Sequence, residues 1–188
     1  IHERLVGSEM CIRDRVVPNV APVLDTSLTP ELKAMLTGVA PSQGQNVGDL
    51  VSSLVTGFSD ADGQMARKGI AITGFDQSSG TLYYSTHAQT NWQAVGDVSE
   101  SNALLLSADA DTRLYFAPKD GSQAGVRSPI QFRAWDGSYS SEGAKVNATV
   151  HGGASAFSDQ TDDLSVRILA NPVFILSLIH ISEPTRRS

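Results

Sequence analysis

The sequence predicts an all-β fold, a sandwich of about seven to nine short strands. Apolar and polar side chains alternate with a period of two along much of the chain, the pattern of strands with one buried face. Turn-forming residues separate these segments at short intervals. Apolar residues make up 40% of the 188 residues, enough to build a core. Strands at this spacing favour a β-sandwich over alternating strands and helices.

Each predicted strand has one set of apolar side chains that we expect to face the core. In chain order the sets are Ile70 and Ile72; Leu82 and Tyr84; Leu114 and Phe116; Ile130, Phe132 and Ala134; and Leu164, Val166 and Ile168. Gln131 and Arg133 are expected on the opposite face, toward solvent. Shorter strands are predicted at residues 50–55, 91–95 and 103–106.

Two stretches are less regular. Residues 29–36, with Pro30 and then Leu32, could form one capped helical turn or an extended segment. Residues 137–158 are rich in Gly, Ser and Ala, which predicts a long surface loop. Its apolar side chains are few, Val146, Val150 and Phe157 being the main ones.

Both ends of the chain are identified as translated sequencing adapter of the transposase-tagmentation type. Residues 4–15 read RLVGSEMCIRDR, and residues 176–186 read LSLIHISEPTR. One adapter sequence, read in its two orientations, encodes both segments. We therefore assign residues 1–15 and 176–188 to this artefact and exclude them from fold reasoning. Because the chain starts with Ile1 and shows no signal peptide, it is expected to be an internal fragment.

Composition excludes several classes of protein. The formal net charge of −6 argues against nucleic-acid binding, which requires clustered Lys and Arg. No apolar run approaches the roughly 20 residues of a membrane-spanning helix. Cys11 is the one cysteine and belongs to the adapter, so neither a disulfide framework nor a cysteine zinc site is expected.

Residues 16–169 resemble one repeat of the tandem cadherin-like, immunoglobulin-type modules of large bacterial surface and type I secreted adhesins. The likeness rests on NVAPVLDTS from Asn19, SDADG from Ser59, GIAITGFD, GTLYYST, SNALLLSADADTRLYFAP, IQFRAWD and AFSDQTDDLSVRIL. Residues 170–175 look like the start of the next linker, as Asn19 to Pro22 look like the previous one. The resemblance implies an immunoglobulin-like (cadherin-like) β-sandwich.

The resemblance also implies a calcium site at the pole next to the preceding linker. Asp60 and Asp62 correspond to its Asp-x-Asp pair, Asp136 to the Asp of its Ala-x-Asp segment, and Asn19 to a linker oxygen ligand. Ca²⁺ takes six to eight oxygens, so it needs ligands from several loops. The sequence departs from the pattern in two places. Val20 stands where the linker usually has Asp, and the acidic segment after the first strand is missing near residues 36–38. The alternative is that these three aspartates are solvated turn residues.

The function expected from the resemblance is a structural or adhesive spacer repeat of an extracellular or cell-surface bacterial protein. Its expected partners are the neighbouring repeats, with a cell-surface or glycan ligand as a further possibility. The alternative is a carbohydrate-binding module of a secreted hydrolase, in which exposed aromatic rings would stack on sugars. We expect Trp92 and Trp135 to fill the sandwich or its edges instead. Catalysis is not expected, because His87 and His151 have no nucleophile motif nearby.

Overall fold

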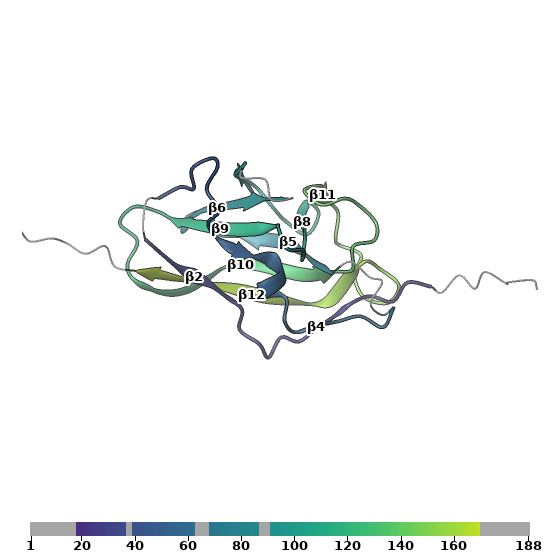
Figure 1. Ribbon diagram of the computed structural model, residues 1–188. Coiled ribbons are helices and arrows are strands. Elements are labelled where there is room, and N and C mark those ends of the chain that lie inside the picture. Colours follow the sequence, from purple (N-terminus) through teal and green to yellow (C-terminus); the bar gives the residue numbers. More distant parts are fainter. Residues whose placement is uncertain (1–17, 37–38, 63–67, 87–90, 170–188) are drawn as a thin grey trace, which may run out of the picture.

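The computed structural model describes residues 18–36, 39–62, 68–86 and 91–169, and it shows a fold built almost wholly of β-strands (Figure 1). The larger sheet has six strands in the order β11 (Lys145–Val146), β8 (Ala103–Ser107), β5 (Gly69–Phe75), β10 (Gly125–Trp135), β12 (Phe157–Leu169) and β2 (Glu31–Leu36). The smaller has four in the order β3 (Asp49–Leu50), β9 (Arg113–Pro118), β6 (Gly80–Ser85) and β7 (Gln93–Ala94). β1 (Val23–Leu24) and β4 (Phe58–Ser59) form a separate pair.

The main core lies between the two sheets, and it confirms most of the predicted core-facing side chains. Tyr84 is only partly buried and Ile168 is buried outside this cluster, whereas Arg133 is buried and the prediction that it faces solvent was wrong. The larger sheet contributes Ile70, Ile72, Leu104, Leu106, Ile130, Phe132, Ala134, Leu164 and Val166, and the smaller sheet contributes Leu82, Leu114 and Phe116. Leu24, Val51, Leu54, Phe58 and Val95 close it at the edges. Side chains with a period of two therefore point into one shared interior, as strands packed face to face require.

Part of the outer face of the larger sheet is also apolar, and residues 137–157, which include the edge strand β11 and the first residue of β12, close over it. Ala71, Leu105 and Trp135 are buried there with Val146 of β11, Ala148, Ala156 and Phe157 of β12. The prediction of a plain surface loop was therefore wrong. The alternating pattern identifies the core side of β5 and β8, but Ala71 and Leu105 make the other side apolar as well, and that side needs a cover.

The smaller sheet is covered in the same way by residues 39–48. Trp92, Tyr115 and Ala117 pack together on its outer face. The Tyr115 hydroxyl donates to the Val39 carbonyl at 2.9 Å, and Trp92 Nε1 donates to the Gln45 carbonyl at 3.0 Å. Trp92 and Trp135 are both buried, as predicted.

Two local predictions are resolved by hydrogen bonding. Residues 31–36 are extended rather than helical and form β2, which pairs in parallel with β12. The predicted strand at residues 50–55 is wrong, because only Asp49–Leu50 pair as β3 and Val51–Leu54 form the single helical turn α1. Val51 and Leu54 are three residues apart and both buried, which suits a helical turn better than a strand. The Ser53 hydroxyl donates to the Leu50 carbonyl at 2.7 Å and closes that turn.

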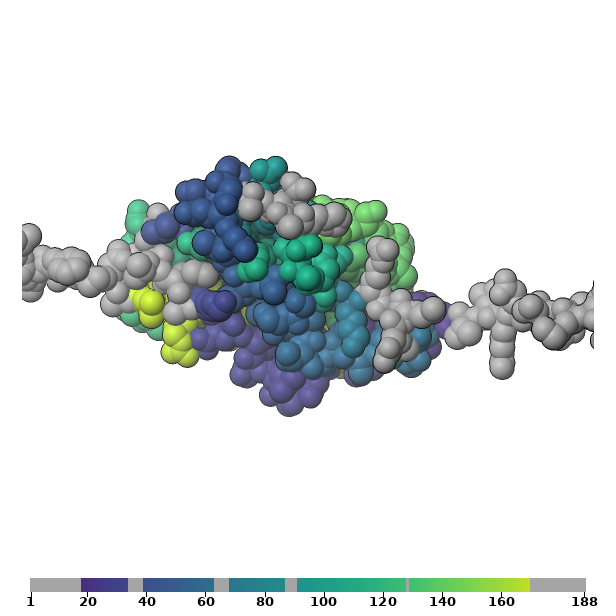
Figure 2. All heavy atoms as spheres, viewed as in Figure 1, coloured from purple at the N-terminus to yellow at the C-terminus, as the bar shows by residue number. Residues whose placement is uncertain are grey.

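The described chain enters and leaves at opposite ends of the molecule. In Figure 1 the first described residues (purple) lie at the right end, and β12 finishes at the left end (yellow). The antiparallel strands β10 and β12, with 11 and 13 residues, run along the length between the ends. In the space-filling view, purple and blue surface from residues 18–33 and 39–62 extends along the face turned to the viewer (Figure 2). The predicted adapter segments and residues 170–175 lie outside the described residues, and the boundaries 16 and 169 stay predictions.

Candidate functional site

The four predicted ligand residues meet at the end of the molecule where the chain enters. Asn19 precedes β1, Asp60 and Asp62 follow β4, and Asp136 follows β10 directly. They sit on three separate segments, and the fold brings these segments together at one pole. We call the group formed by Asn19, Val20, Asp60, Asp62 and Asp136 the linker clamp.

Hydrogen bonds tie the entering segment to both aspartate turns. Asn19 Nδ2 donates to Asp136 Oδ2 at 2.8 Å, and the Val20 backbone N–H donates to Asp62 Oδ2 at 2.9 Å. Asp60 Oδ1 accepts from the Asp62 backbone N–H at 2.9 Å, which orders that turn. Asp136 is 4% exposed, so its bond to Asn19 is shielded from water.

The covering segment 137–157 also binds the entering segment, a contribution that the sequence did not reveal. Asn19 Nδ2 also donates to the Ser155 carbonyl at 3.0 Å, and the Ala21 backbone N–H donates to the Gly153 carbonyl at 2.8 Å. Both acceptors are backbone groups in a Gly-rich loop, so no side-chain motif announces them. The one available signal is Gly152–Gly153 itself, because two successive glycines with positive φ allow a tight reversal there.

The donor chemistry of the linker clamp does not fit a complete calcium shell. Asn19 turns its NH₂ group toward Asp136, and Asp62 Oδ2 is occupied by the Val20 N–H. Across the described parts of residues 18–169, no group of three or more His, Cys, Asp or Glu is placed to hold a metal ion. One carboxylate oxygen, Asp60 Oδ2, is buried with no hydrogen-bond partner and is the atom best suited to a cation. Since Ca²⁺ takes six to eight oxygens, calcium binding here stays a prediction.

Two carboxyls have pKa values lowered by local turns, and a third has its pKa raised by burial. Asp25 accepts from the hydroxyl and backbone N–H of Ser27, and these bonds lower the pKa of Asp25. Ser78 lowers the pKa of Asp76 in the same way. Burial raises the pKa of Asp162, with the charges of Asp163 and Asp25 adding to the effect.

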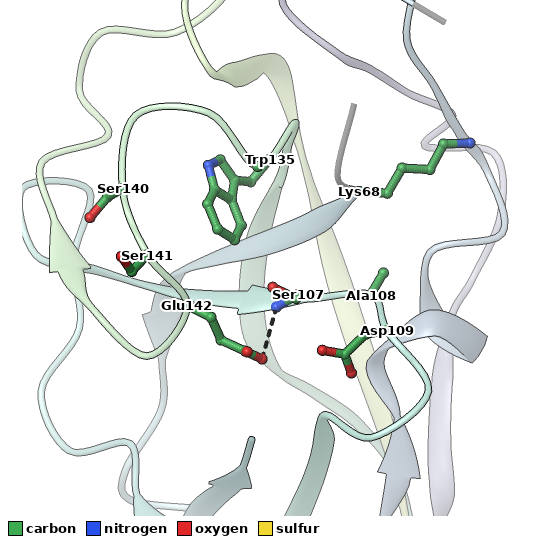
Figure 3. Close-up of a pocket in the computed structure, with 9 residues that line it drawn as sticks. Lys68, Ser107, Ala108, Asp109, Trp135, Ser140, Ser141 and Glu142 are labelled. Atoms are coloured by element: carbon green, nitrogen blue, oxygen red, sulfur yellow. Dashed lines mark hydrogen bonds between the residues drawn. The ribbon is translucent and has the colours of Figure 1, made fainter. Parts of the chain in front are cut away.

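The second Asp-Ala-Asp segment is a turn, and it joins the two sheets rather than forming a hairpin within one. Asp109 Oδ1 accepts from the backbone N–H groups of Asp111 and Thr112, at 2.9 and 2.6 Å, between β8 and β9. Next to this turn is a cavity of about 560 Å³ under the Trp135 ring (Figure 3). Glu142 Oε1 accepts there from the Ser107 N–H at 3.4 Å and from the Thr112 hydroxyl. These bonds hold the covering segment against β8 and β9.

Comparison of the chain with protein-family models, with curated proteins and with solved structures found no match. In the part of the chain that the structure describes, no helix is long and apolar enough to cross a membrane. The class of protein defined so far is an all-β protein with two main packed sheets, whose entering segment is hydrogen-bonded to one pole.

Proposed function

We propose that the chain is a spacer repeat of a large bacterial surface or secreted adhesin, linked at each pole to a neighbouring repeat. The observation that carries this proposal is the position of the described ends, which lie at opposite ends of the sandwich (Figure 1). A chain that enters at one pole and leaves at the other can be joined end to end with copies of itself. The linker clamp fixes the entering segment to the body, which suits a repeat that must hold its neighbour at a set angle.

Strand order supports an immunoglobulin-like unit. In such domains one sheet contains B, E and D as neighbours and the other contains C, F and G. Here β3, β9 and β6 are neighbours in that order, as are β5, β10 and β12. The chain visits them as β3, β5, β6, β9, β10 and β12, which matches B, C, D, E, F and G. The departures are a two-residue B strand and extra strands at the sheet edges: β8 and β11 beyond C, β7 beside D and β2 beside G.

The pairing of β2 with β12 supports a load-bearing role. The two strands are parallel, with Ser165 opposite Glu31 and Leu169 opposite Leu36. A pull on the two ends draws the start of β2 one way and the finish of β12 the other. The force then runs along the strands and loads the ladder bonds together. The Arg167 guanidinium also donates to both carboxylate oxygens of Glu31, at 2.7 and 3.1 Å, across this pair.

The proposal predicts that resistance to force depends on where the chain is held. We expect a higher unfolding force when the 188-residue chain is pulled by its termini than when it is pulled through cysteines at Ser78 and Asp120. Those exposed residues flank the antiparallel pair β6–β9 at one end, so its bonds would open one after another. Single-molecule force spectroscopy, with Cys11→Ser in the second geometry, measures both. An equal or lower force from the termini would contradict the spacer proposal.

A second prediction concerns calcium. We expect 10 mM Ca²⁺ to leave the unfolding midpoint of the chain within about 1 °C of its value in chelator. Asp60 Oδ2 is the one buried clamp oxygen without a hydrogen-bond partner, whereas Asp136 Oδ2 and Asp62 Oδ2 already accept internal hydrogen bonds. A site with the usual extracellular affinity, about 10⁻⁴–10⁻³ M, would add roughly 1.4–2.7 kcal/mol, or about 3–10 °C. Differential scanning calorimetry distinguishes these results. A rise of that size, lost in Asp60→Asn and kept in the exposed control Asp120→Asn, would show that calcium completes the clamp. The spacer proposal does not depend on which result is obtained.

A further inference from the structure

We propose that a pocket beside the linker clamp binds a neutral sugar residue. The pocket has a volume of about 520 Å³, within the range of small-ligand sites, and it opens next to Asn19. The residues that line it include Asn19, Ser138, Tyr139, Asn147, Val150 and Phe157. We call it the Tyr139 pocket. The inference goes beyond the spacer role and stands on separate observations.

Tyr139 supplies an exposed aromatic ring held in a fixed place. It is 72% exposed, whereas Trp92 and Trp135 are buried. Its ring meets the buried Phe157 ring edge to face, with centroids 6.1 Å apart and planes at 73°. Its φ is +77°, in the left-handed region that bulky side chains rarely adopt. The fold thus presents this ring at a cost in backbone strain, which is a feature of binding sites.

The polar atoms around the ring leave one donor, one acceptor and one hydroxyl for a ligand. Asn147 Oδ1 accepts from the backbone N–H and hydroxyl of Thr149, so its Nδ2 is the donor that remains. Asn19 Nδ2 donates to Asp136 and Ser155, so its Oδ1 is the acceptor that remains. The Ser138 backbone N–H and carbonyl are bonded to Asp136 and Trp135, which leaves its hydroxyl.

These groups match a pyranose better than other ligands. A sugar ring offers an apolar face for Tyr139 and Val150, and hydroxyls that both donate and accept. None of the described residues that line the pocket carries a charge, which favours a neutral sugar over a uronic acid, a nucleotide or a charged peptide. By contrast, the cavity under Trp135 is lined by the carboxylates of Asp109 and Glu142 (Figure 3).

Saturation-transfer difference NMR on the 188-residue chain tests the proposal. The probes are glucose, galactose, mannose and N-acetylglucosamine, with glucuronate as the anionic comparison. We expect transfer to at least one neutral sugar, with a dissociation constant of about 1–10 mM for a ligand of roughly a dozen heavy atoms. Tyr139→Ala should weaken binding at least tenfold, and Tyr139→Phe should keep it within about threefold. The control Val126→Ala removes an exposed apolar side chain from the far end of β10 and should change nothing.

A further variant separates binding from a merely structural role of the ring. Tyr139→Gly removes the ring and suits the positive φ. We expect it to abolish sugar binding without lowering the unfolding midpoint. Three results would overturn the proposal: no transfer to any neutral sugar, equal binding of glucuronate, or unchanged binding in Tyr139→Ala. Shifts in the Tyr139 ring resonances that depend on chain concentration and not on sugar would also overturn it, since they would assign the pocket to a contact between copies.

Discussion

Replacing Trp135 by alanine is expected to lower the free energy of unfolding by about 3–5 kcal/mol. Trp135 is 2% exposed and is the largest side chain between the larger sheet and its covering segment. Its Nε1 donates to the Ser138 carbonyl at 2.7 Å, so the change also removes this bond, and that carbonyl keeps only the Ser140 backbone N–H as a donor. Gly69 lies directly beneath the indole, where an added Cβ would come within 2.7 Å of the ring. The variant therefore leaves a cavity that the backbone of β5 cannot fill.

The Trp135→Ala substitution should also disturb the packing at both ends of the covering segment. Urea unfolding followed by circular dichroism measures the stability loss, and the NMR experiment measures sugar binding. Trp135→Phe keeps most of the apolar area and should cost less than Trp135→Ala. Tyr139 is an exposed aromatic residue four positions further on, and Tyr139→Ala should lower the free energy of unfolding by less than about 1 kcal/mol. A loss below about 1 kcal/mol for Trp135→Ala would show that the covering segment is not packed as described.

Much of the architecture could be predicted because burial imposes a simple period. The sets around Ile70, Leu114, Ile130 and Leu164 all face the shared core, since a slip of one residue would place each set in water. The period cannot show whether the opposite face is bare or covered. Small residues such as Ala71 and Ala148 fit under a cover without a distinct sequence signal. For this reason the covering segment was missed, and with it one side of the Tyr139 pocket.

The site at the pole was predicted from the resemblance. The sequence could show that its residues come together, but not how their side chains are oriented. The sequence places Asp60, Asp62 and Asp136 after separate strands, and the fold brings them to the entering segment. Spacing along the chain carries no information on which atom of Asn19 faces Asp136. That orientation depends on the Ser155 carbonyl, 136 residues away, which requires the NH₂ group on the same side. Tertiary structure therefore determines whether Asn19 acts as a hydrogen-bond donor or as a cation ligand.

Replacing Arg133 by methionine is expected to lower the free energy of unfolding by about 2–4 kcal/mol, although the alternating pattern places Arg133 toward solvent. The residue does lie on the outer face of β10, but it is 5% exposed, and its guanidinium group contacts the first part of β12 and Glu100. Its Nη1 donates to the carbonyls of Ser158 and Asp159, at 3.0 and 2.7 Å, and its Nη2 contacts Glu100 Oε1 at 2.6 Å. Methionine replaces the aliphatic stem but removes the donor to both carbonyls. The bond to Ser158 is buried and the bond to Asp159 is partly buried, and a buried acceptor left without a donor costs about 1–3 kcal/mol.

The contribution of the charge pair can be separated from that of the two carbonyls. The Glu100 side chain is 45% exposed, so the pair is partly screened and Glu100→Gln should cost less than about 1 kcal/mol. Arg133→Lys keeps the charge but loses the planar fork, so it cannot reach all three acceptors and should fall between the other two variants. Urea unfolding of the three variants gives the order directly. If Glu100→Gln cost as much as Arg133→Met, the ion pair and not the carbonyls would hold the start of β12. The expected order instead makes Arg133 a structural donor that fixes the strand running from the linker clamp to the far pole.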